Sequence, residues 1–371
     1  MEAIRHLVFV IYDGIQNSVF QSQILQPLLK RLDENPVLHI TLISYERNSF
    51  SYQTMASIIP ALDRFDVIIA RRMPFLGRAS LLQATRTMRK MLEMLSPDYC
   101  IARGPLAGYV VLKAYSHLLL RARRGGVALH DRVLPPVVVQ ARGLAAEEFR
   151  YTKMYRNIGP INKIIFWGLY GMLRKVEEIV YGNKLLYAQV KPVRIESVSR
   201  ALKHYLEENF NANPRFVEVV DYDVPVQVPS ETLLVWRKEI RELLRIPLNA
   251  AVYCYSGSYK PWQCIDETML HFMQVREHDP RALLLILSED EALFSKKIEE
   301  YRIAAEYYRL VNVHAKDLLR YLAAADFGYL LRHADIINWV SRPTKFLEYK
   351  AAGLLVIHNN TIGMLCGEQD A

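Results

Sequence analysis

The chain of 371 residues has a hydrophobic content of 51% and a charged content of 23%, which is typical of a globular protein with room for two domain cores. Its formal net charge of +8 is concentrated in residues 1–200, which carry 28 Lys and Arg against 15 Asp and Glu. This asymmetry favours an anionic surface as a partner of the first half, and because the sequence has no zinc-finger spacing, RNP-like motif or basic tail, we expect no nucleic acid partner.

Short apolar runs in the first half predict strands that alternate with helices. Strands separated by helical segments are the repeat unit of a parallel sheet covered by helices. We therefore predict a Rossmann-like, doubly wound α/β domain over residues 1–225. The predicted strands lie at residues 7–12, 37–44, 66–70, 99–102, 136–140, 193–199 and 215–220.

Two segments of this first domain are compatible with a membrane surface. Residues 71–95 predict a basic amphipathic helix, in which six Lys and Arg residues face the single acid Glu93. Residues 164–170 include Phe166, Trp167 and Tyr170 and are flanked by basic residues. Both compositions are typical of segments that lie on an anionic membrane. A helix packed on a sheet and ordinary core packing are the alternatives, and no apolar stretch approaches the ~18 residues that span a bilayer.

The second half predicts another α/β domain after a linker. Pro225 and Pro229 mark a linker composition, and we assign residues 226–248 to the linker and residues 249–371 to the second domain. Only a few residues follow the last predicted strand, so we expect the closing helix of this domain to be incomplete. The predicted strands lie at residues 251–255, 282–287, 310–313, 327–331 and 354–357.

The segment 326–358 predicts a strand, a loop, a helix and a second strand. Ser341 as a cap and Pro343 in the first turn mark the helix start. A helix start favours a phosphate through its unpaired N–H groups and partial positive charge. Lys345 lies in this first turn, and Glu348 follows at i+3 on nearly the same face. The pair can therefore bind a nucleoside diphosphate, with an ordinary surface Lys–Glu pair as the alternative.

This stretch resembles the donor-site segment of GT-B glycosyltransferases, and the most similar group is the retaining family four type that builds bacterial surface polysaccharides. The resemblance implies two Rossmann-like domains facing each other across a cleft. It also implies transfer of a sugar, with retention, from a nucleotide diphosphate sugar to a hydroxyl of a lipid-linked or saccharide acceptor, without a cofactor or a required metal. The matching residues are Leu330-Leu331-Arg332, Asn338, Ser341-x-Pro343-x-Lys345-Phe346-x-Glu348-Tyr349 and Ala352-Gly353.

The resemblance also implies roles for residues of this segment. Glu348 would bind the ribose, and backbone amides at the helix start, near Thr344, would hold the diphosphate. Many members of the family carry an earlier Glu at the position that Val340 occupies here. Asn338 or Ser341 would therefore contact the sugar instead, and we count Asn338 as a candidate catalytic residue.

A second phosphate-binding element is expected after the first strand of the second domain. Gly257 lies in a loop between a strand and a helix, and such a loop can cradle phosphate. The family often places an Arg and a Lys in this region. Here Lys260 is available, but Ser258 stands where the Arg is expected. We expect Lys345 or Arg332 to complete the cationic clamp.

The first domain would contribute two loops to the site. The family's first strand–helix loop faces the cleft, so Gly14 and Gln16 could approach the donor or the acceptor, or could form an ordinary turn. Arg142 follows a strand at the edge where doubly wound sheets bind ligands, and we predict it near the transferred sugar as a catalytic residue. For Glu147 and Glu148 we favour simple charge at a helix start over catalysis.

Two rival functions share the same architecture: an epimerase acting on a nucleotide sugar, and a GT-B-like binding module without turnover. No His, Cys or Asp cluster has the spacing of a metal site. His333 beside Asp335 is expected to be a hydrogen-bonded loop histidine. The four cysteines have no C-x-x-C spacing and are expected to be free thiols in a reducing, cytoplasmic compartment.

Overall fold

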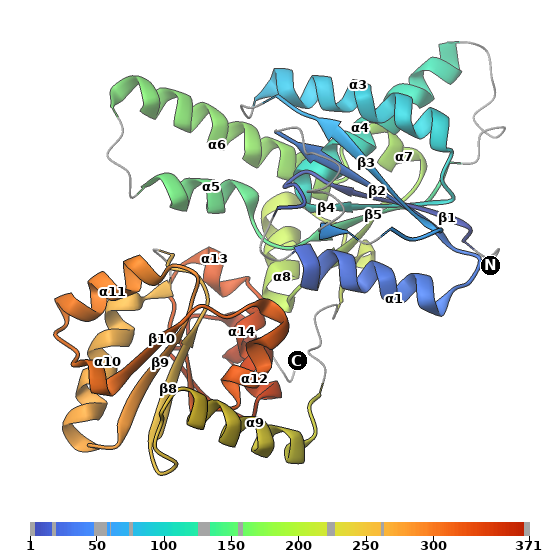
Figure 1. The fold of residues 1–371 in the computed structure, drawn as a ribbon. Coiled ribbons are helices and arrows are strands. Elements are labelled where there is room, and N and C mark those ends of the chain that lie inside the picture. The colour runs from blue at the N-terminus through green and yellow to red at the C-terminus, as the bar shows by residue number, and fades with distance from the viewer. Residues whose placement is uncertain are drawn as a thin grey trace. The chain divides into compact units, whose positions relative to one another are not determined.

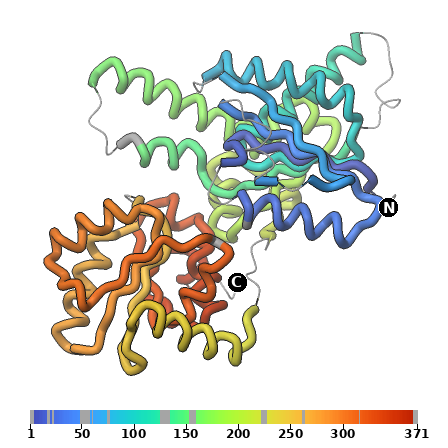
Figure 2. The backbone as a smooth tube through the Cα atoms, viewed as in Figure 1, coloured from blue at the N-terminus to red at the C-terminus, as the bar shows by residue number. Residues whose placement is uncertain are grey.

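The computed structural model describes residues 4–16, 20–47, 58–59, 61–73, 77–124, 134–154, 159–220, 227–260 and 263–366. The chain forms two compact units, Met1–Tyr222 and Asp223–Ala371 (Figures 1 and 2). Each unit has its own parallel sheet and its own helices, which confirms the prediction of two Rossmann-like α/β domains.

The first unit contains a seven-stranded sheet in the order β3-β2-β1-β4-β5-β6-β7, and all of its strands pair in parallel. Most of its inner strands are buried on both faces, which is why they appear in the sequence as continuous apolar runs. The chain leaves β1 toward β2 on one side and later returns to β4 on the other. The strands are β1 (His6–Ile11), β2 (His39–Glu46), β3 (Phe65–Arg71), β4 (Tyr99–Arg103), β5 (Val137–Ala141), β6 (Arg194–Ser197) and β7 (Val217–Val219).

Helices connect these strands, and α4 packs against α3, α6 and α7. A π-helical turn at Gln21–Leu25 leads into α1, and a short 3₁₀ turn precedes β7 at Pro214–Phe216. The helices are α1 (Gln26–Glu34), α3 (Arg78–Leu95), α4 (Gly104–Arg124), α5 (Ala145–Met154), α6 (Pro160–Tyr181), α7 (Leu186–Val190) and α8 (Arg200–Phe210).

The basic helix is shorter than predicted. It begins at Arg78 rather than at Arg71, because Arg71 is the last residue of β3 and pairs with Glu46 of β2. The next residue, Arg72, donates its backbone N–H to the Glu46 carbonyl and lies over the ring of Tyr12, with 4.9 Å between its Cζ and the ring centroid. The sheet therefore holds the first two arginines of the predicted helix.

The second unit contains a five-stranded parallel sheet in the order β10-β9-β8-β11-β12. Its core lies on both faces of β8 and β9, whose apolar side chains are buried. The chain leaves β8 toward β9 on one side and later returns to β11 on the other. The strands are β8 (Ala251–Ser256), β9 (Ala282–Leu287), β10 (Tyr308–Val311), β11 (Phe327–Leu330) and β12 (Leu355–His358).

The helices of the second unit alternate with these strands. The second unit also contains three short 3₁₀ turns, at Ala305–Tyr307, Ala315–Asp317 and Gly363–Leu365. The predicted closing helix includes residues 367–371, which lie outside the described residues. The helices are α9 (Ser230–Leu243), α10 (Ile265–His278), α11 (Glu291–Glu300), α12 (Leu318–Leu322), α13 (Ile336–Trp339) and α14 (Thr344–Ala351).

Most of the expected linker, residues 226–248, is helical and belongs to the second unit. Helix α9 occupies Ser230–Leu243 and packs against α12. Its Arg241 is fully buried and donates to the carboxylate of Asp326 at 2.9 Å and to the backbone carbonyls of Ala324, Leu248 and Ala250. Composition did not predict this helix, because the tertiary contacts that hold it are not visible in the residues of one segment.

No helix in the described parts of the chain is long and apolar enough to cross a membrane.

We expect Arg241→Ala to destabilise the second unit by about 3–5 kcal/mol, because it would remove one of the two guanidinium partners of Asp326 and leave several buried backbone carbonyls unpaired. Urea unfolding of the full chain would measure this effect. Arg320 is the matched control, because it pairs with Glu239 at 2.8 Å in an exposed position, and Arg320→Ala should cost about 1 kcal/mol or less. Equal effects of the two substitutions would contradict the anchoring role of Arg241.

Candidate functional site

A cluster of buried charged side chains in the second unit lies where the sheet order reverses. Strands β8 and β11 are neighbours, but the chain reaches them from opposite sides. Open parallel sheets bind ligands beyond the carboxyl ends of the strands at such a switch point. Gly257 follows β8 directly, and Arg332 follows shortly after β11. The sequence predicted each residue to follow a strand, and the strand order of the structure makes these two strand ends neighbours.

Gly257 is required by its backbone conformation and by its neighbour. Its φ is +113°, which side-chain-bearing residues rarely adopt, and a Cβ would lie 2.6 Å from the Cε of Lys345. Its N–H donates to the Leu287 carbonyl at 2.8 Å. The glycine loop and the first turn of α14 are therefore in direct contact, although the two segments are far apart in sequence.

Lys345 is buried beneath this loop. Its Nζ donates to Oε1 of Gln263 and lies 4.1 Å from the ring centroid of Tyr255, a cation–π contact. Burial, and secondarily the charge of Arg332, hold the pKa of Lys345 well below its usual value. A lysine in this position favours the arrival of an anion, because an anion would stabilise its protonated form.

Arg332 and Glu348 complete the charge distribution around Lys345. Arg332 is buried, and desolvation lowers its pKa. Glu348 is half-buried, and desolvation raises its pKa, although the nearby Lys345 opposes the shift. Within the described residues, the Glu348 carboxylate accepts no hydrogen bond and forms no ion pair. The site thus holds two buried cations and one carboxylate, an excess of positive charge.

Tyr349 fixes α14 against the sheet. Its hydroxyl accepts the N–H of Ser256 at 3.0 Å and donates to the carbonyl of Tyr329 at 3.3 Å. A Cβ on Gly328 would lie only 2.4 Å from Cδ2 of the Tyr349 ring, so the absence of a side chain at Gly328 leaves room for this ring. The helix start that carries Thr344 and Lys345 is therefore held against the ends of β8 and β11.

The other predicted donor residues have different surroundings. Lys260 is exposed on the glycine loop, and Thr344 is the first residue of α14. Asn338 is almost fully buried, and its amide nitrogen donates to the His333 carbonyl at 3.0 Å. Ser341 donates its hydroxyl to the Asn338 carbonyl at 2.8 Å. Asn338 and Ser341 therefore hold the loop before α14, a role that the sequence did not predict.

The first unit has a cavity of about 120 Å³ at its own switch point, between the ends of β1 and β4. The structure places Arg142 on its wall, together with Asp13, Arg103 and Glu148. Glu148 remains accessible through the cavity, but the surrounding protein displaces much of the water, and this desolvation, with the charge of Asp13, raises its pKa to about 7. Sequence reasoning did not single out Asp13 and Arg103 as site residues, although each lies at the carboxyl end of a predicted strand, and for Glu148 it favoured simple charge at a helix start.

The predicted loop residues Gly14 and Gln16 are not among the residues that line this cavity, although Gly14 directly follows Asp13, which does. Gly14 has a φ of +87°, and a Cβ on it would lie 2.5 Å from Oε2 of Glu46. The same carboxylate accepts the N–H of Ile15 at 2.7 Å. Gly14 therefore serves the packing of the loop on β2, and Gln16 is exposed.

No protein-family model matches the sequence, and no curated protein is significantly similar to it. Solved structures with the same fold include a glycosyltransferase from Rickettsia africae ESF-5, with a TM-score of 0.62 and 13% identity over 99% of this chain and 82% of that one. Sucrose-phosphate synthase from Thermosynechococcus elongatus has a TM-score of 0.64 and 12% identity over 97% and 82%. Anabaena HepE in complex with UDP-glucose has a TM-score of 0.58 and 12% identity over 97% and 82%. The chain therefore has the GT-B architecture of two parallel α/β units.

A buried carboxyl group next to the first-unit cavity should make the stability of the protein depend on pH. Glu177 of α6 is fully buried and accepts the N–H of Ala146, in the first turn of α5, at 3.4 Å. Burial raises its pKa from 4.5 to about 8. Between these two values the folded protein holds a proton that the unfolded chain has released, so stability falls as the pH rises, with a slope approaching about 1.4 kcal/mol per pH unit.

We expect Glu177→Gln to flatten the pH dependence of unfolding between pH 5 and pH 8, because the amide does not titrate. Glu178→Gln is the control on the same helix. The ion pairs of Glu178 with Lys184 and Lys175 lower its pKa to about 2, so its contribution is constant across this window and is lost only in acid. Urea unfolding at each pH would measure both slopes, and an unchanged slope in Glu177→Gln would contradict the assignment.

Proposed function

We propose that the protein is a glycosyltransferase that moves a sugar, with retention, from a nucleotide diphosphate sugar to a hydroxyl of a lipid-linked or saccharide acceptor. The observation that carries the proposal is the excess of buried positive charge formed by Arg332 and Lys345 at the switch point of the second sheet. A diphosphate supplies two neighbouring negative charges of the kind that would offset the cost of burying these cations. The proposed transfer needs no metal ion.

The residues around this charge suit the remaining parts of such a donor. The amides at the start of α14, near Thr344, are unpaired within the helix and favour phosphate oxygens. The half-buried carboxyl group of Glu348 lies one turn further on and would accept hydrogen bonds from two ribose hydroxyls. Negative charge grows on the diphosphate as the sugar leaves, so Arg332 and Lys345 would stabilise the transition state.

The acceptor side of the reaction is assigned to the cavity of the first unit. Arg142 and Arg103 provide cationic donors there, and Asp13 and Glu148 provide carboxyl groups that can accept hydrogen bonds from hydroxyls. We assign Arg142 a catalytic role near the transferred sugar. The similar fold of HepE, which is solved with UDP-glucose, supports a nucleotide sugar as the donor class.

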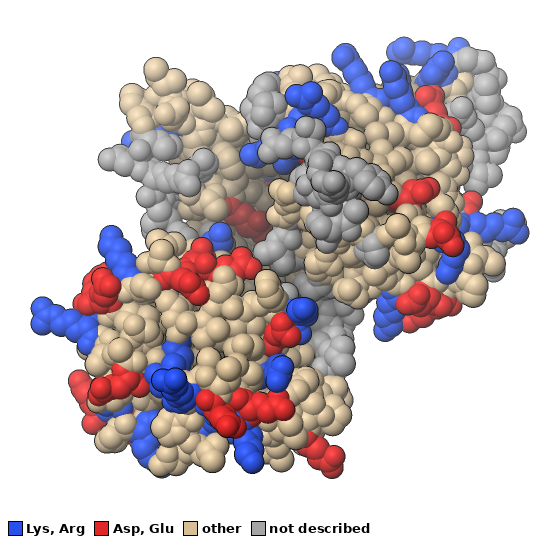
Figure 3. Space-filling model, in the orientation of Figure 1, with Lys and Arg blue, Asp and Glu red and all other residues tan. Residues whose placement is uncertain are grey.

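We further propose that the first unit binds an anionic membrane surface, where a lipid-linked acceptor would be available. Arg78, Arg86 and Lys90 lie on the exposed face of α3, and Figure 3 shows Lys and Arg side chains gathered over α3 and the end of α4. The start of α6 exposes large apolar side chains that a membrane interface would cover. These are Ile161, Ile164, Ile165 and Trp167.

Substitutions in α14 test the donor site. We expect Glu348→Ala to weaken binding of the matching nucleoside diphosphate about ten- to a hundred-fold, because it removes a charged hydrogen-bond acceptor. Lys345→Met keeps the buried volume and removes the charge, so it should weaken the diphosphate far more than the nucleoside. Isothermal titration would measure both, after a thermal-shift panel with UDP, GDP, ADP and CMP identifies the base.

Lys350 is the matched control, because it lies on the same helix and is exposed. Lys350→Ala should bind nucleotide like the parent protein. Parent-like binding by both site variants would remove the main support for the donor site. Incubation of the parent protein with the nucleotide sugar alone would reveal an epimerase, which changes the sugar without an acceptor. A transferase would move the sugar to an added acceptor, and a binding module would catalyse neither reaction.

Charge reversal tests the membrane proposal. We expect the triple variant Arg78→Glu, Arg86→Glu, Lys90→Glu to lose most of its binding to anionic vesicles, because each cation near such a surface contributes about 1 kcal/mol. Binding of the parent protein should fall steeply with salt. Reversal of the exposed Lys238, Lys296 and Lys316 in the second unit is the control. Equal binding of the parent to neutral and anionic vesicles would end the proposal.

A further inference from the structure

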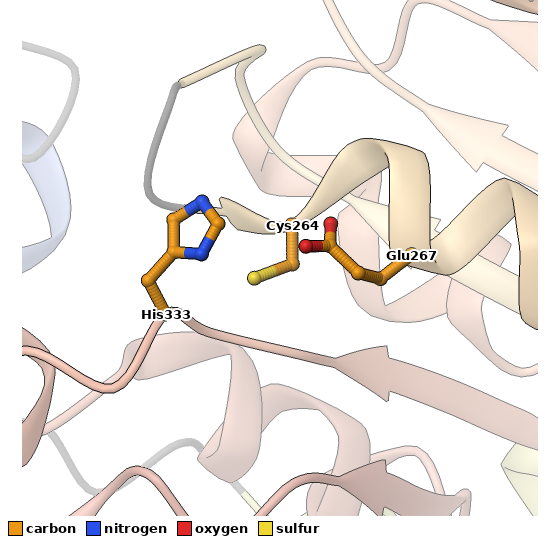
Figure 4. Close-up of side chains that lie close together, drawn as sticks. All are labelled: Cys264, Glu267 and His333. Atoms are coloured by element: carbon orange, nitrogen blue, oxygen red, sulfur yellow. The ribbon is translucent and has the colours of Figure 1, made fainter.

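Three side chains with metal-binding atoms meet in the second unit, outside the contacts described above. Cys264, Glu267 and His333 each offer one ligand atom, and these atoms all lie within 4.8 Å of one another. Figure 4 shows the Cys264 sulfur and the Glu267 carboxylate on the same side of α10, with the His333 ring approaching from the chain that follows β11. The sequence did not predict this cluster, because His333 is distant from the other two residues along the chain.

The three ligand types together favour one class of cation. Thiolate and imidazole are preferred by Zn²⁺ over hard cations such as Mg²⁺ and Ca²⁺, and a carboxylate oxygen completes a common three-ligand set. In a tetrahedral zinc site neighbouring ligand atoms are about 3.5 Å apart, given Zn–S and Zn–N bonds of about 2.3 and 2.0 Å. The ligand atoms would therefore have to approach one another by up to about 1.3 Å, a change that rotation of the exposed Glu267 and half-exposed His333 side chains would supply.

The backbone on both sides of the cluster is held in place. Cys264 has a φ of 47° and directly precedes α10, and Glu267 lies in the first turn of that helix. On the other side, Asn338 donates its amide N–H to the His333 carbonyl at 3.0 Å. The preceding residue, Arg332, exchanges two backbone hydrogen bonds with the side chain of Asn359, at 3.1 and 2.7 Å. The ligands are therefore presented from two fixed segments rather than from a single loop.

We propose that Cys264, Glu267 and His333 form a binding site for one Zn²⁺ ion, with water in the fourth position. The ion would link the start of α10 to the chain that follows β11 and so fix the segment that carries Arg332. The transfer reaction proposed above does not require this ion, so the zinc site and the transfer reaction can be tested separately. Zinc binding displaces the proton of the Cys264 thiol, because the thiolate is the ligand.

The competing explanation is a hydrogen bond from the Cys264 thiol to the Glu267 carboxylate without a metal. A hydrogen-bonded thiol keeps its proton, whereas a cysteine bound to a metal is a thiolate. The presence of a thiolate bound to a metal is thus a direct sign of the proposed site.

The full-length protein, stripped with a chelator, would be titrated with Zn²⁺ in competition with a chromophoric chelator and, separately, with Co²⁺. We expect one ion per chain and a thiolate-to-cobalt charge-transfer band. Cys264→Ser should abolish the band, and His333→Gln should weaken zinc binding more than about ten-fold, since even residues that only support a metal ligand are worth that much. Glu267→Gln should also weaken binding, and because Glu267 is exposed this variant should keep its fold.

The controls remove a thiol and an imidazole elsewhere in the same unit. Cys366 and His314 are both exposed, so Cys366→Ser and His314→Gln should bind zinc like the parent protein. The absence of a stoichiometric ion would overturn the proposal, and so would a cobalt complex without the thiolate band. Parent-like affinity in both Glu267→Gln and His333→Gln would do the same, whether or not Cys264→Ser folds.

Discussion

The burial of two cations side by side is the constraint on which the second unit depends. Arg332 and Lys345 repel each other in an environment with little water, and Glu348 offsets only part of this repulsion. The surrounding structure accommodates them by specific means: the ring of Tyr255 beneath the ammonium group, the amide oxygen of Gln263, and a glycine at 257 that leaves room for the lysine. Such an arrangement costs stability in the absence of an anion, and proteins retain such costs chiefly at functional sites.

The order of the strands explains why both candidate sites occur where they do. In each sheet the connections reverse direction once near the middle, between β1 and β4 in the first unit and between β8 and β11 in the second. Doubly wound sheets bind ligands where the loops after such strands diverge to opposite faces. Asp13 and Arg103 line the cavity at the first of these points, and Gly257 and Arg332 follow the strands at the second. One topological rule thus places two chemically different sites in two domains that share little sequence pattern.

The two ends of the second sheet serve different purposes. At the amino end, buried Arg241 satisfies several carbonyls and, with Arg237, the carboxylate of Asp326, so that α9 and β11 are tightly fixed. At the carboxyl end, the charges are incompletely matched, and the loop before α14 is held by the modest contacts of Asn338 and Ser341. A rigid base with a polar, incompletely satisfied rim is suited to ligand binding, because binding can then supply the missing interactions without reorganising the sheet.

The sequence by itself predicted the two parallel α/β units and the helix that begins near Pro343 and carries Lys345 and Glu348. Both depend on local patterns, namely apolar runs buried on two faces and charged residues in a helix start, and local patterns are visible without a structure. The helix α9 within the expected linker, the packing role of Gly14 and the loop-holding role of Asn338 were decided only by the tertiary structure. The same is true of the cavity with Glu148 and of the meeting of Cys264 with His333. Each of these features depends on which strand ends lie next to each other, and that order is set by the packing of the whole sheet rather than by residues near one another along the chain.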